Sequence, residues 1–325
     1  MMGTSFVPPS RAVLTDCVRS AITAPSLHNS QPWMFRVEPP TVWVYADPDR
    51  RLPVVDPDGR EHLISVGAAI VTLRLAIRRA GYDVEYELLP DPGKPLLAAR
   101  VTAGRPLAAD QVTEALAAAI PYRHTNRWPF ARVAVPADVI ERLRAAARGE
   151  GAALTVADPI GRDAILGLAR AADRWLRERP HYGEEISRWS GRGVRHHGVP
   201  VWAAGPWDAL EVMPVRDFAG LTPLPRPREP FEPHSTVMIL TTDGDTARDW
   251  LAAGQAMQRV LLTATWLGLA TTPISQPVEA PEIRKRLTRR PAQMVLRVGY
   301  GKTTGRTPRR PLNDVLLPAD LPAPR

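Results

Sequence analysis

The feature that most constrains this chain is a long helical segment that occurs twice. Residues 61–80 and 247–267 each have the apolar spacing of a largely buried helix, and the two segments align without a gap. The matched positions in the two copies are Gly67 with Gly254, Ala69 with Ala256, Leu75 with Leu262, and Gly81 with Gly268. A shorter amphipathic segment precedes each copy (11–24 and 137–147) and a strand follows it. This shared order predicts a duplicated unit.

Small residues at the start of both long helices would let two helix backbones approach closely. We therefore expect the helices to pack against each other, as two subunits of a dimer would if both lay in one chain. The predicted domains are an N-terminal unit at residues 1–120 and a C-terminal unit at residues 121–325.

Short strands alternate with the helices, and each half holds few of them. Two strands are expected within 33–46, and others at 82–89, 97–102, 153–157, 236–242, 270–274 and 293–299. This order predicts an α+β fold, with mixed or antiparallel sheets flanked by helices. Residues 180–235 have no clean periodicity and are rich in Pro, Gly, Trp and Arg. We expect an ordered lid or arm there, and a disordered segment is the alternative.

Composition excludes several classes of protein. No window of the 325 residues holds the ~18 uninterrupted apolar residues of a membrane span, and no secretory signal is evident. Cys17 is the only cysteine, so an intramolecular disulfide is excluded and a cytoplasmic location is expected. The formal net charge is +8, and nearly all of the basic residues are arginines. That excess fits either nucleic-acid binding or the codon usage of a GC-rich genome, and only placement can decide.

Four short motifs carry residues suited to binding a cofactor. The loop at residues 24–33 offers short polar side chains and free amides for a phosphate or a ring edge, although such residues also form ordinary turns. In the run 123–127, two arginines flank a hydroxyl and an imidazole, which suits a dianion or simply a solvated basic stretch. The third motif is 271–276, and the fourth joins 299–301 with 309–311.

The ordered set of these motifs resembles the nitroreductase family of FMN enzymes. It is most similar to the Acg-type flavoproteins, in which two nitroreductase units look fused in one chain. The resemblance covers roughly residues 10–316. Further segments that carry it are 215–218, 250–256 and 308–315.

The resemblance implies one FMN per chain, because each unit keeps only part of a site and the two parts complement each other. The phosphate would be held by Arg123, Thr125, Arg127 and Arg310, and Arg309, next to Arg310, would also bind the cofactor. The cofactor would also contact Pro25, Ser26, Leu27, His28 and Asn29 from one side, and Pro273, Ile274 and Ser275 from the other. NAD(P)H would be the co-substrate, and a small nitroaromatic or quinone would accept the electrons. No catalytic side chain is required, because the flavin carries the chemistry. The family often has an acidic residue where Ser275 stands.

The resemblance leaves two functions open. One is an oxidoreductase, and the other is an FMN-sequestering flavoprotein whose lid, 180–235, blocks NAD(P)H. We expect no nucleic-acid partner and no membrane partner. We also expect no metal, because His196 and His197 have no partner at ligand spacing. The expected state is a monomer, with a homodimer left open.

Overall fold

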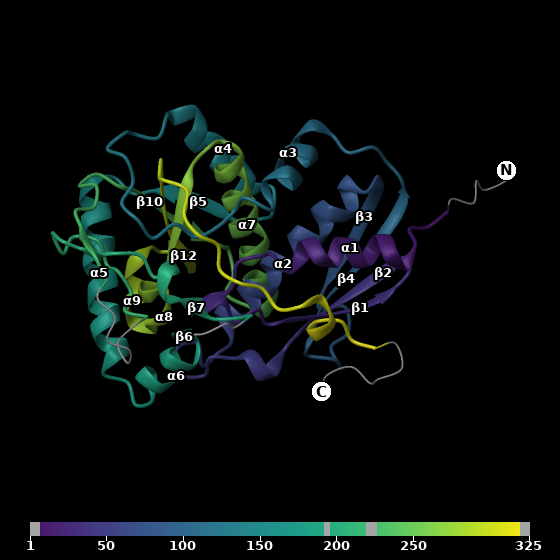
Figure 1. The fold of residues 1–325 in the computed structure, drawn as a ribbon, viewed down its shortest axis with the longest axis horizontal. Coiled ribbons are helices and arrows are strands. Elements are labelled where there is room, and N and C mark those ends of the chain that lie inside the picture. The colour runs from purple at the N-terminus through teal and green to yellow at the C-terminus, as the bar shows by residue number, and fades with distance from the viewer. Residues whose placement is uncertain (1–6, 192–195, 219–225, 319–325) are drawn as a thin grey trace.

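The protein consists of two halves, each built on a four-stranded antiparallel sheet (Figure 1). The computed structural model describes residues 7–191, 196–218 and 226–318. The two long helices, α2 (Arg60–Arg79) and α7 (Ala247–Trp266), run between the halves. This arrangement confirms the predicted α+β class.

The first sheet has the order β1-β2-β4-β3. Its strands are β1 (Trp33–Glu38), β2 (Thr41–Ala46), β3 (Tyr82–Leu88) and β4 (Leu97–Pro106). The helices of this half are α1 (Arg11–Ala21), α2 and α3 (Gln111–Ala119). A side chain caps α1 and another caps α3, because the Ser10 hydroxyl accepts the N–H of Val13 and Asp110 accepts that of Thr113.

The second sheet has the order β11-β12-β10-β5. Its strands are β5 (Ala153–Val156), β10 (Thr236–Thr241), β11 (Ala270–Ile274) and β12 (Ala292–Gly299). Its helices include α4 (Ala137–Arg148), α7, α8 (Gln276–Glu279) and α9 (Pro281–Leu287). A capping box of Thr246 and Asp249 begins α7.

The two sheets have the same topology when each is taken from the strand that follows its long helix. The first then reads β3-β4-β2-β1 and the second β11-β12-β10-β5. In both, the last strand named follows the shorter helix, α1 or α4. This shared order supports the predicted duplication.

The long helices cross at the two glycines that the repeat aligns. A Cβ atom added to Gly254 would lie 2.0 Å from the carbonyl oxygen of Ile64, and one added to Gly67 would lie 2.2 Å from that of Leu251. Only glycine permits so close a backbone approach. The principal hydrophobic core is continuous across this crossing and contains residues of both halves.

A long insertion separates β5 from β10, where the first unit has only the turn between β1 and β2. It holds α5 (Pro159–Arg177) and α6 (Tyr182–Arg188). Two short parallel pairs follow, β6 (Ser190–Gly191) with β7 (Val199–Pro200), and β8 (Trp207–Asp208) with β9 (Arg228–Glu229). The segment 180–235 therefore has regular structure in its described part, which its irregular sequence did not indicate.

The C-terminal segment crosses from the second half to the first (Figure 1). The N–H of Phe35 donates to the carbonyl of Val315 and the N–H of Leu317 donates to the carbonyl of Phe35, both at 2.8 Å. Residues near 315 thus extend the first sheet along β1. This crossing carries the late arginine pair past the loop that follows α1.

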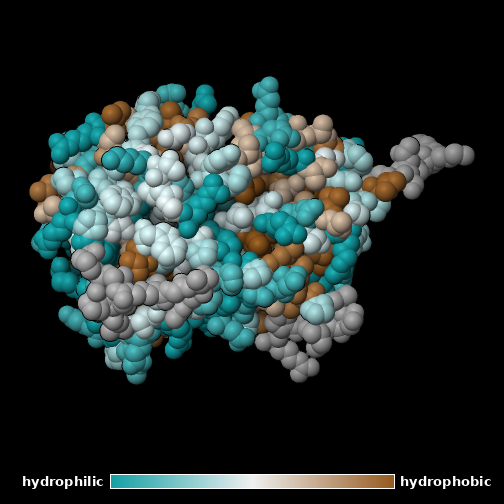
Figure 2. Space-filling model, in the orientation of Figure 1, coloured by the Kyte–Doolittle hydropathy of each residue, from teal (hydrophilic) through white to brown (hydrophobic). Residues whose placement is uncertain are grey.

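Hydrophilic side chains cover most of the face shown in Figure 2, with hydrophobic ones scattered among them. Among the described residues, no helix combines the length and the apolar character needed to cross a membrane.

Candidate flavin site

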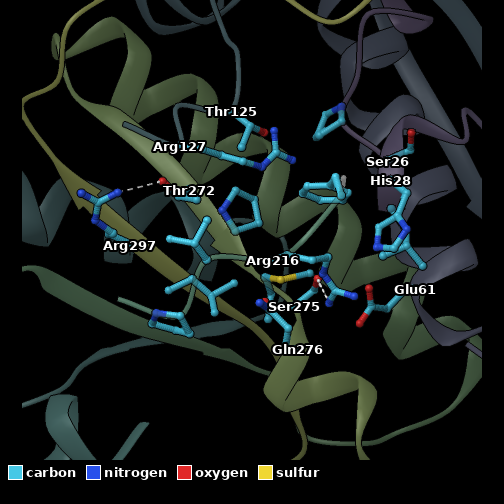
Figure 3. A pocket seen from close by; sticks show the side chains of 18 of the residues that line it. Ser26, His28, Glu61, Thr125, Arg127, Arg216, Thr272, Ser275, Gln276 and Arg297 are labelled. Atoms are coloured by element: carbon cyan, nitrogen blue, oxygen red, sulfur yellow. Dashed lines mark hydrogen bonds between the residues drawn. The ribbon is translucent and has the colours of Figure 1, made fainter. Parts of the chain in front are cut away.

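A pocket lies where the two halves meet, and both contribute side chains to it (Figure 3). It encloses about 900 Å³ between protein atoms, including space open to solvent. The first half supplies the loop after α1 and the start of α2. The second half supplies the run before α4, β11, and part of the insertion. A pocket of this size and mixed lining is typical of a cofactor site.

Nine of the thirteen predicted binding residues line this pocket. They are Pro25, Ser26, Leu27, His28, Thr125, Arg127, Pro273, Ile274 and Ser275. Four others, Asn29, Arg123, Arg309 and Arg310, do not belong to the lining. Asn29, Arg123 and Arg309 lie beside the pocket and bond to the chain segments that form its edge. Arg310 forms an ion pair with Asp47 instead.

The loop after α1 is held in an unusual backbone conformation. His28 and Asn29 have φ values of +47° and +55°, in the left-handed region that L residues adopt rarely. The hydroxyl of Ser26 accepts the N–H of Gln31 at 2.9 Å, and the N–H of Leu27 donates to Ser65 of α2 at 3.0 Å. These bonds fix the loop against α2 and direct it into the pocket.

Within the part of the chain that the structure describes, neither ring nitrogen of the His28 imidazole has a hydrogen-bond partner. The residue is 6% exposed, and the ring of Phe218 lies edge-on to it with centroids 5.4 Å apart. Burial lowers the pKa of His28 well below its ordinary value, and the positive charges of Arg216 and Arg127 lower it further. The ring is therefore neutral, with one nitrogen able to donate and one able to accept.

Asn29 ties three chain segments together beside the pocket. Its Nδ2 donates to the carbonyl of Gly198 at 2.9 Å and to that of Pro308 at 3.0 Å. Its Oδ1 accepts a bond from Arg309 at 3.0 Å. In this structure Asn29 positions the insertion and Arg309.

A buried guanidinium group, that of Arg123, and a partly buried one, that of Arg309, meet next to the Pro25 end of the pocket. Arg123 and Arg309 both donate to the carbonyl oxygen of Thr23, at 3.3 and 3.0 Å. Burial lowers the pKa of Arg123 to about 9, with Arg309 adding repulsion, and burial lowers the pKa of Arg309 to about 10. In the described part of the chain, neither is bonded to a carboxylate, and the Nε of each has no partner. Two adjacent cations without a counter-ion form a site for an anion.

Arg310 is engaged elsewhere. Its guanidinium forms an ion pair with Asp47 at 3.2 Å and donates to the carbonyls of Gln31 and Asp314. Its backbone N–H donates to the side chain of Gln31 at 2.8 Å. Arg310 anchors the crossing C-terminal segment, and Arg309 is the member of the pair that faces Arg123.

The run 123–127 lies along β11. Thr125 and Thr271 form a parallel bridge, and the N–H of Asn126 donates to the carbonyl of Thr271 at 2.9 Å. Arg127 donates to the carbonyl of Ala203 at 2.8 Å and stacks 5.0 Å from the ring centroid of Phe218. Burial lowers the pKa of Arg127 to about 10. The second and third predicted motifs are thus brought together at one wall of the pocket.

Sequence reasoning missed several lining residues. They come from α2, from the insertion, and from α7, β11 and β12, and they include Glu61, Ser65, Arg216, Phe218, Met257, Thr272 and Arg297. Arg297 forms a buried ion pair with Glu232 whose shortest distance is 2.5 Å. The repeated long helices and the segment 215–218 were recognised in the sequence. No local pattern showed which of their side chains would line the pocket.

The described residues contain no group of three or more His, Cys, Asp or Glu side chains placed to hold a metal ion. The contact of His196 with the loop after α1 is made by its backbone, since its carbonyl oxygen accepts a hydrogen bond from Nε2 of Gln31 at 2.8 Å.

No family model matches this chain. A protein of Mycobacterium tuberculosis that carries the provisional name NAD(P)H nitroreductase is 34% identical over 327 residues, which cover 97% of this chain and 93% of the relative. Another from that organism, provisionally named NAD(P)H nitroreductase Acg, is 32% identical over 330 residues, covering 94% and 97%. A solved nitroreductase with bound FMN from Desulfitobacterium hafniense gives a TM-score of 0.38 at 15% identity, covering 63% of this chain and 98% of that one.

The extent and identity of these matches place the chain in the nitroreductase family. Among its relatives is Acg, so the resemblance inferred from the motifs is confirmed.

Proposed function

We propose that this chain is an FMN-dependent oxidoreductase that takes electrons from NAD(P)H and passes them to a nitroaromatic or quinone-like small molecule. The observation that carries the proposal is the pair of guanidiniums of Arg123 and Arg309, which share the carbonyl of Thr23 and have no carboxylate partner among the described residues. A phosphate monoester supplies the missing negative charge and accepts bonds from their unpaired nitrogens. The names of the relatives and of the solved nitroreductases support FMN and NAD(P)H as the ligands.

The residues of the pocket fit the rest of a flavin mononucleotide. Thr125 and Arg127 extend the set of donors away from the phosphate end. The loop Pro25–His28 and the strand end Pro273–Ser275 supply two walls for a flat ring system, and the neutral imidazole of His28 offers an unused hydrogen bond. When bound, FMN supplies hydride chemistry, and the protein binds, orients and shields it.

A single flavin per chain is part of this proposal. In the duplicated unit, the loop after α4 corresponds to the loop after α1. This loop contains Glu150, whose side chain is only 1% exposed. Glu150 forms ion pairs with Arg74 of α2 at 2.7 Å and with Arg259 of α7 at 3.0 Å. Internal ion pairs of Glu150 therefore occupy the position that would correspond to the flavin loop in the second half.

The insertion favours one alternative function, the sequestering of FMN without turnover. Its residues Met213–Arg216 and Phe218 line the pocket, and Phe218 lies against both His28 and Arg127. A lid in this position would control the access of nicotinamide to the ring.

Anaerobic stopped-flow reduction separates the two functions. Under the proposal, NADPH or NADH bleaches the FMN absorption band of the wild-type protein. If dithionite reduces the bound FMN but neither NADPH nor NADH does, the oxidoreductase function is refuted and the sequestering function is supported. The Phe218→Ala variant then serves as a comparison, since opening the lid should raise the rate with nicotinamide in either case.

A further inference from the structure

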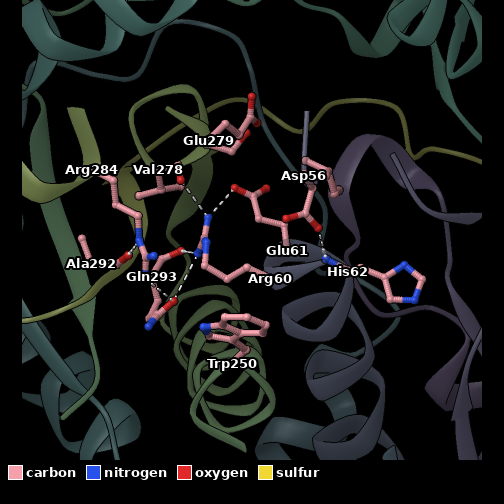
Figure 4. A network of polar contacts seen from close by, with 12 residues as sticks. Asp56, Arg60, Glu61, His62, Trp250, Val278, Glu279, Arg284, Ala292 and Gln293 are labelled. Atoms are coloured by element: carbon pink, nitrogen blue, oxygen red, sulfur yellow. Dashed lines mark hydrogen bonds and ion pairs between the residues drawn. The ribbon is translucent and has the colours of Figure 1, made fainter. Parts of the chain in front are cut away.

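A buried group of charged side chains lies beside the pocket, at the start of α2 (Figure 4). Asp56, Arg60 and Glu61 come from this part of the chain, and Glu279 comes from α8. Arg216 of the insertion joins them from the pocket side. None of these residues belonged to the predicted flavin site.

The group holds more acids than bases. Its three carboxyl groups, Asp56, Glu61 and Glu279, face two guanidiniums, Arg60 and Arg216. Arg284 approaches Arg60 but is already paired with Asp245 at 2.7 Å. If all three acids were ionised, one negative charge would be buried without compensation, which is costly. One of the three acids therefore keeps its proton.

Burial raises the pKa of Asp56 as well as that of Glu61, and the hydrogen bonds distinguish the two acids. Glu279 has both oxygens 2.6 Å from Nη2 of Arg216, and Asp56 accepts the backbone N–H of His62 at 2.8 Å. Glu61 receives one bond, from Nη2 of Arg60 at 2.7 Å, and its Oε2 has no partner. An oxygen without a donor is the one that can carry a hydrogen.

The guanidinium of Arg60 does not bond to Glu61 alone, so its stabilisation of a Glu61 carboxylate is shared with other acceptors. Its guanidinium donates to the carbonyl oxygens of Gln293 and Val278 at 2.8 and 3.1 Å. Burial raises the pKa of Glu61 well above its ordinary value, and Glu279 raises it further, while Arg60 opposes them. Glu61 therefore keeps its proton to higher pH than an exposed glutamate does.

We propose that Glu61 is the acid that delivers a proton to the electron acceptor in this pocket. Glu61 lines the pocket together with Arg216 and Ser275, and its carboxyl group lies beside them in Figure 3. Ser275 comes from the second half, and Glu61 supplies a carboxyl group from the first half. The inference rests on the proposed function, because it requires a reduced flavin in the site.

The step balances for a quinone acceptor. Reduced FMN, when bound, would supply a hydride equivalent to the quinone, and the phenolate oxygen that develops would take a proton from Oε2 of Glu61. The product is the hydroquinone, and Glu61 becomes a carboxylate that Arg60 stabilises. A proton from solvent restores the acid before the next cycle. General acids of this kind contribute about 10²–10⁴-fold in rate.

The first test needs no flavin. Because the folded protein holds a proton on Glu61 that the unfolded chain releases above about pH 4.3, the stability of the wild type should fall as pH rises towards the raised pKa of Glu61. The Glu61→Gln variant should lack this part of the pH dependence. The exposed Glu282, which pairs with Lys285, provides the matched control Glu282→Gln, which should retain it. Parallel pH profiles for wild type and Glu61→Gln would contradict a protonated Glu61.

The second test uses the flavin-loaded protein, reduced by dithionite and mixed with 1,4-benzoquinone at a series of pH values. Glu61→Gln should reoxidise at least about 100-fold more slowly than the wild type. Reoxidation is compared at saturating FMN, so that a change in FMN affinity does not enter the rate, and Glu61→Asp should recover part of the rate. Equal reoxidation rates and pH profiles in Glu61→Gln and Glu282→Gln would overturn the inference. Since dithionite replaces nicotinamide here, failure of NAD(P)H to reduce the flavin would count only against the proposed function.

Discussion

Replacing Gly254 by alanine tests whether the backbones of α2 and α7 are in contact between the two units that form the pocket. The new Cβ atom would lie 2.0 Å from the carbonyl oxygen of Ile64, about 1 Å short of the 3.0 Å that real Cβ atoms keep. The obstructing atom is backbone, so the helices themselves must separate. Overpacking of this kind lowers the free energy of unfolding by about 3 kcal/mol, while the better helix propensity of alanine raises it by about 1 kcal/mol. For a chain of 325 residues, the expected net loss of about 2 kcal/mol lowers Tm by roughly 3 °C.

Thermal unfolding followed by circular dichroism measures this loss, and FMN titration measures its effect on the pocket. Gly167→Ala is the matched control, because Gly167 lies in α5 with its nearest neighbour 3.8 Å from the added Cβ atom. That variant should be as stable as the wild type or more so, by up to about 1 kcal/mol. The double variant Gly67→Ala/Gly254→Ala should cost less than the sum of its parts, since one separation of the helices relieves both clashes. If Gly254→Ala matched Gly167→Ala in Tm, the close crossing of α2 and α7 would be refuted.

Three further predictions concern single side chains. Arg309→Ala should weaken FMN binding by about 10–150-fold through loss of a charged hydrogen bond, as fluorescence titration would show, whereas the exposed Arg290→Ala should leave it unchanged. The wild type should lose stability relative to His28→Asn as pH falls below about 6.5, because the folded state holds His28 neutral and the unfolded chain takes up the proton; parallel denaturation curves between pH 5 and 8 would contradict this. Glu232→Gln should destabilise the protein by about 3–5 kcal/mol in urea unfolding, because it leaves Arg297 buried without its partner, and a loss below 1 kcal/mol would argue against that ion pair.

Much of the fold could be predicted from the sequence because its signals are local. Glycines at the ends of the long helices, helical spacing of apolar residues, and short strands between turns predicted the elements found here, to within a few residues. The aligned glycines Gly67 and Gly254 also predicted which helices cross. Each of these features depends on the backbone conformation of a short segment.

The site was predictable only in part, because several roles depend on residues far away in the chain. Arg309 and Arg310 are adjacent and chemically alike, and the distant carboxylate of Asp47 decides that Arg310 leaves the site. Glu61 looked like an ordinary residue in the first turn of a helix, where acids are common. The role we propose for it rests on its burial and on Glu279, which lies more than 200 residues later in the chain.

The central claim is that two incomplete units close around one flavin phosphate. Titration of the apoprotein with FMN and with riboflavin, followed by absorbance and fluorescence, tests it most directly. We predict one FMN bound per chain, and binding of riboflavin at least about 100-fold weaker, because riboflavin lacks the phosphate that Arg123 and Arg309 would hold. A protein that binds no FMN, binds two per chain, or binds riboflavin equally well would contradict this account.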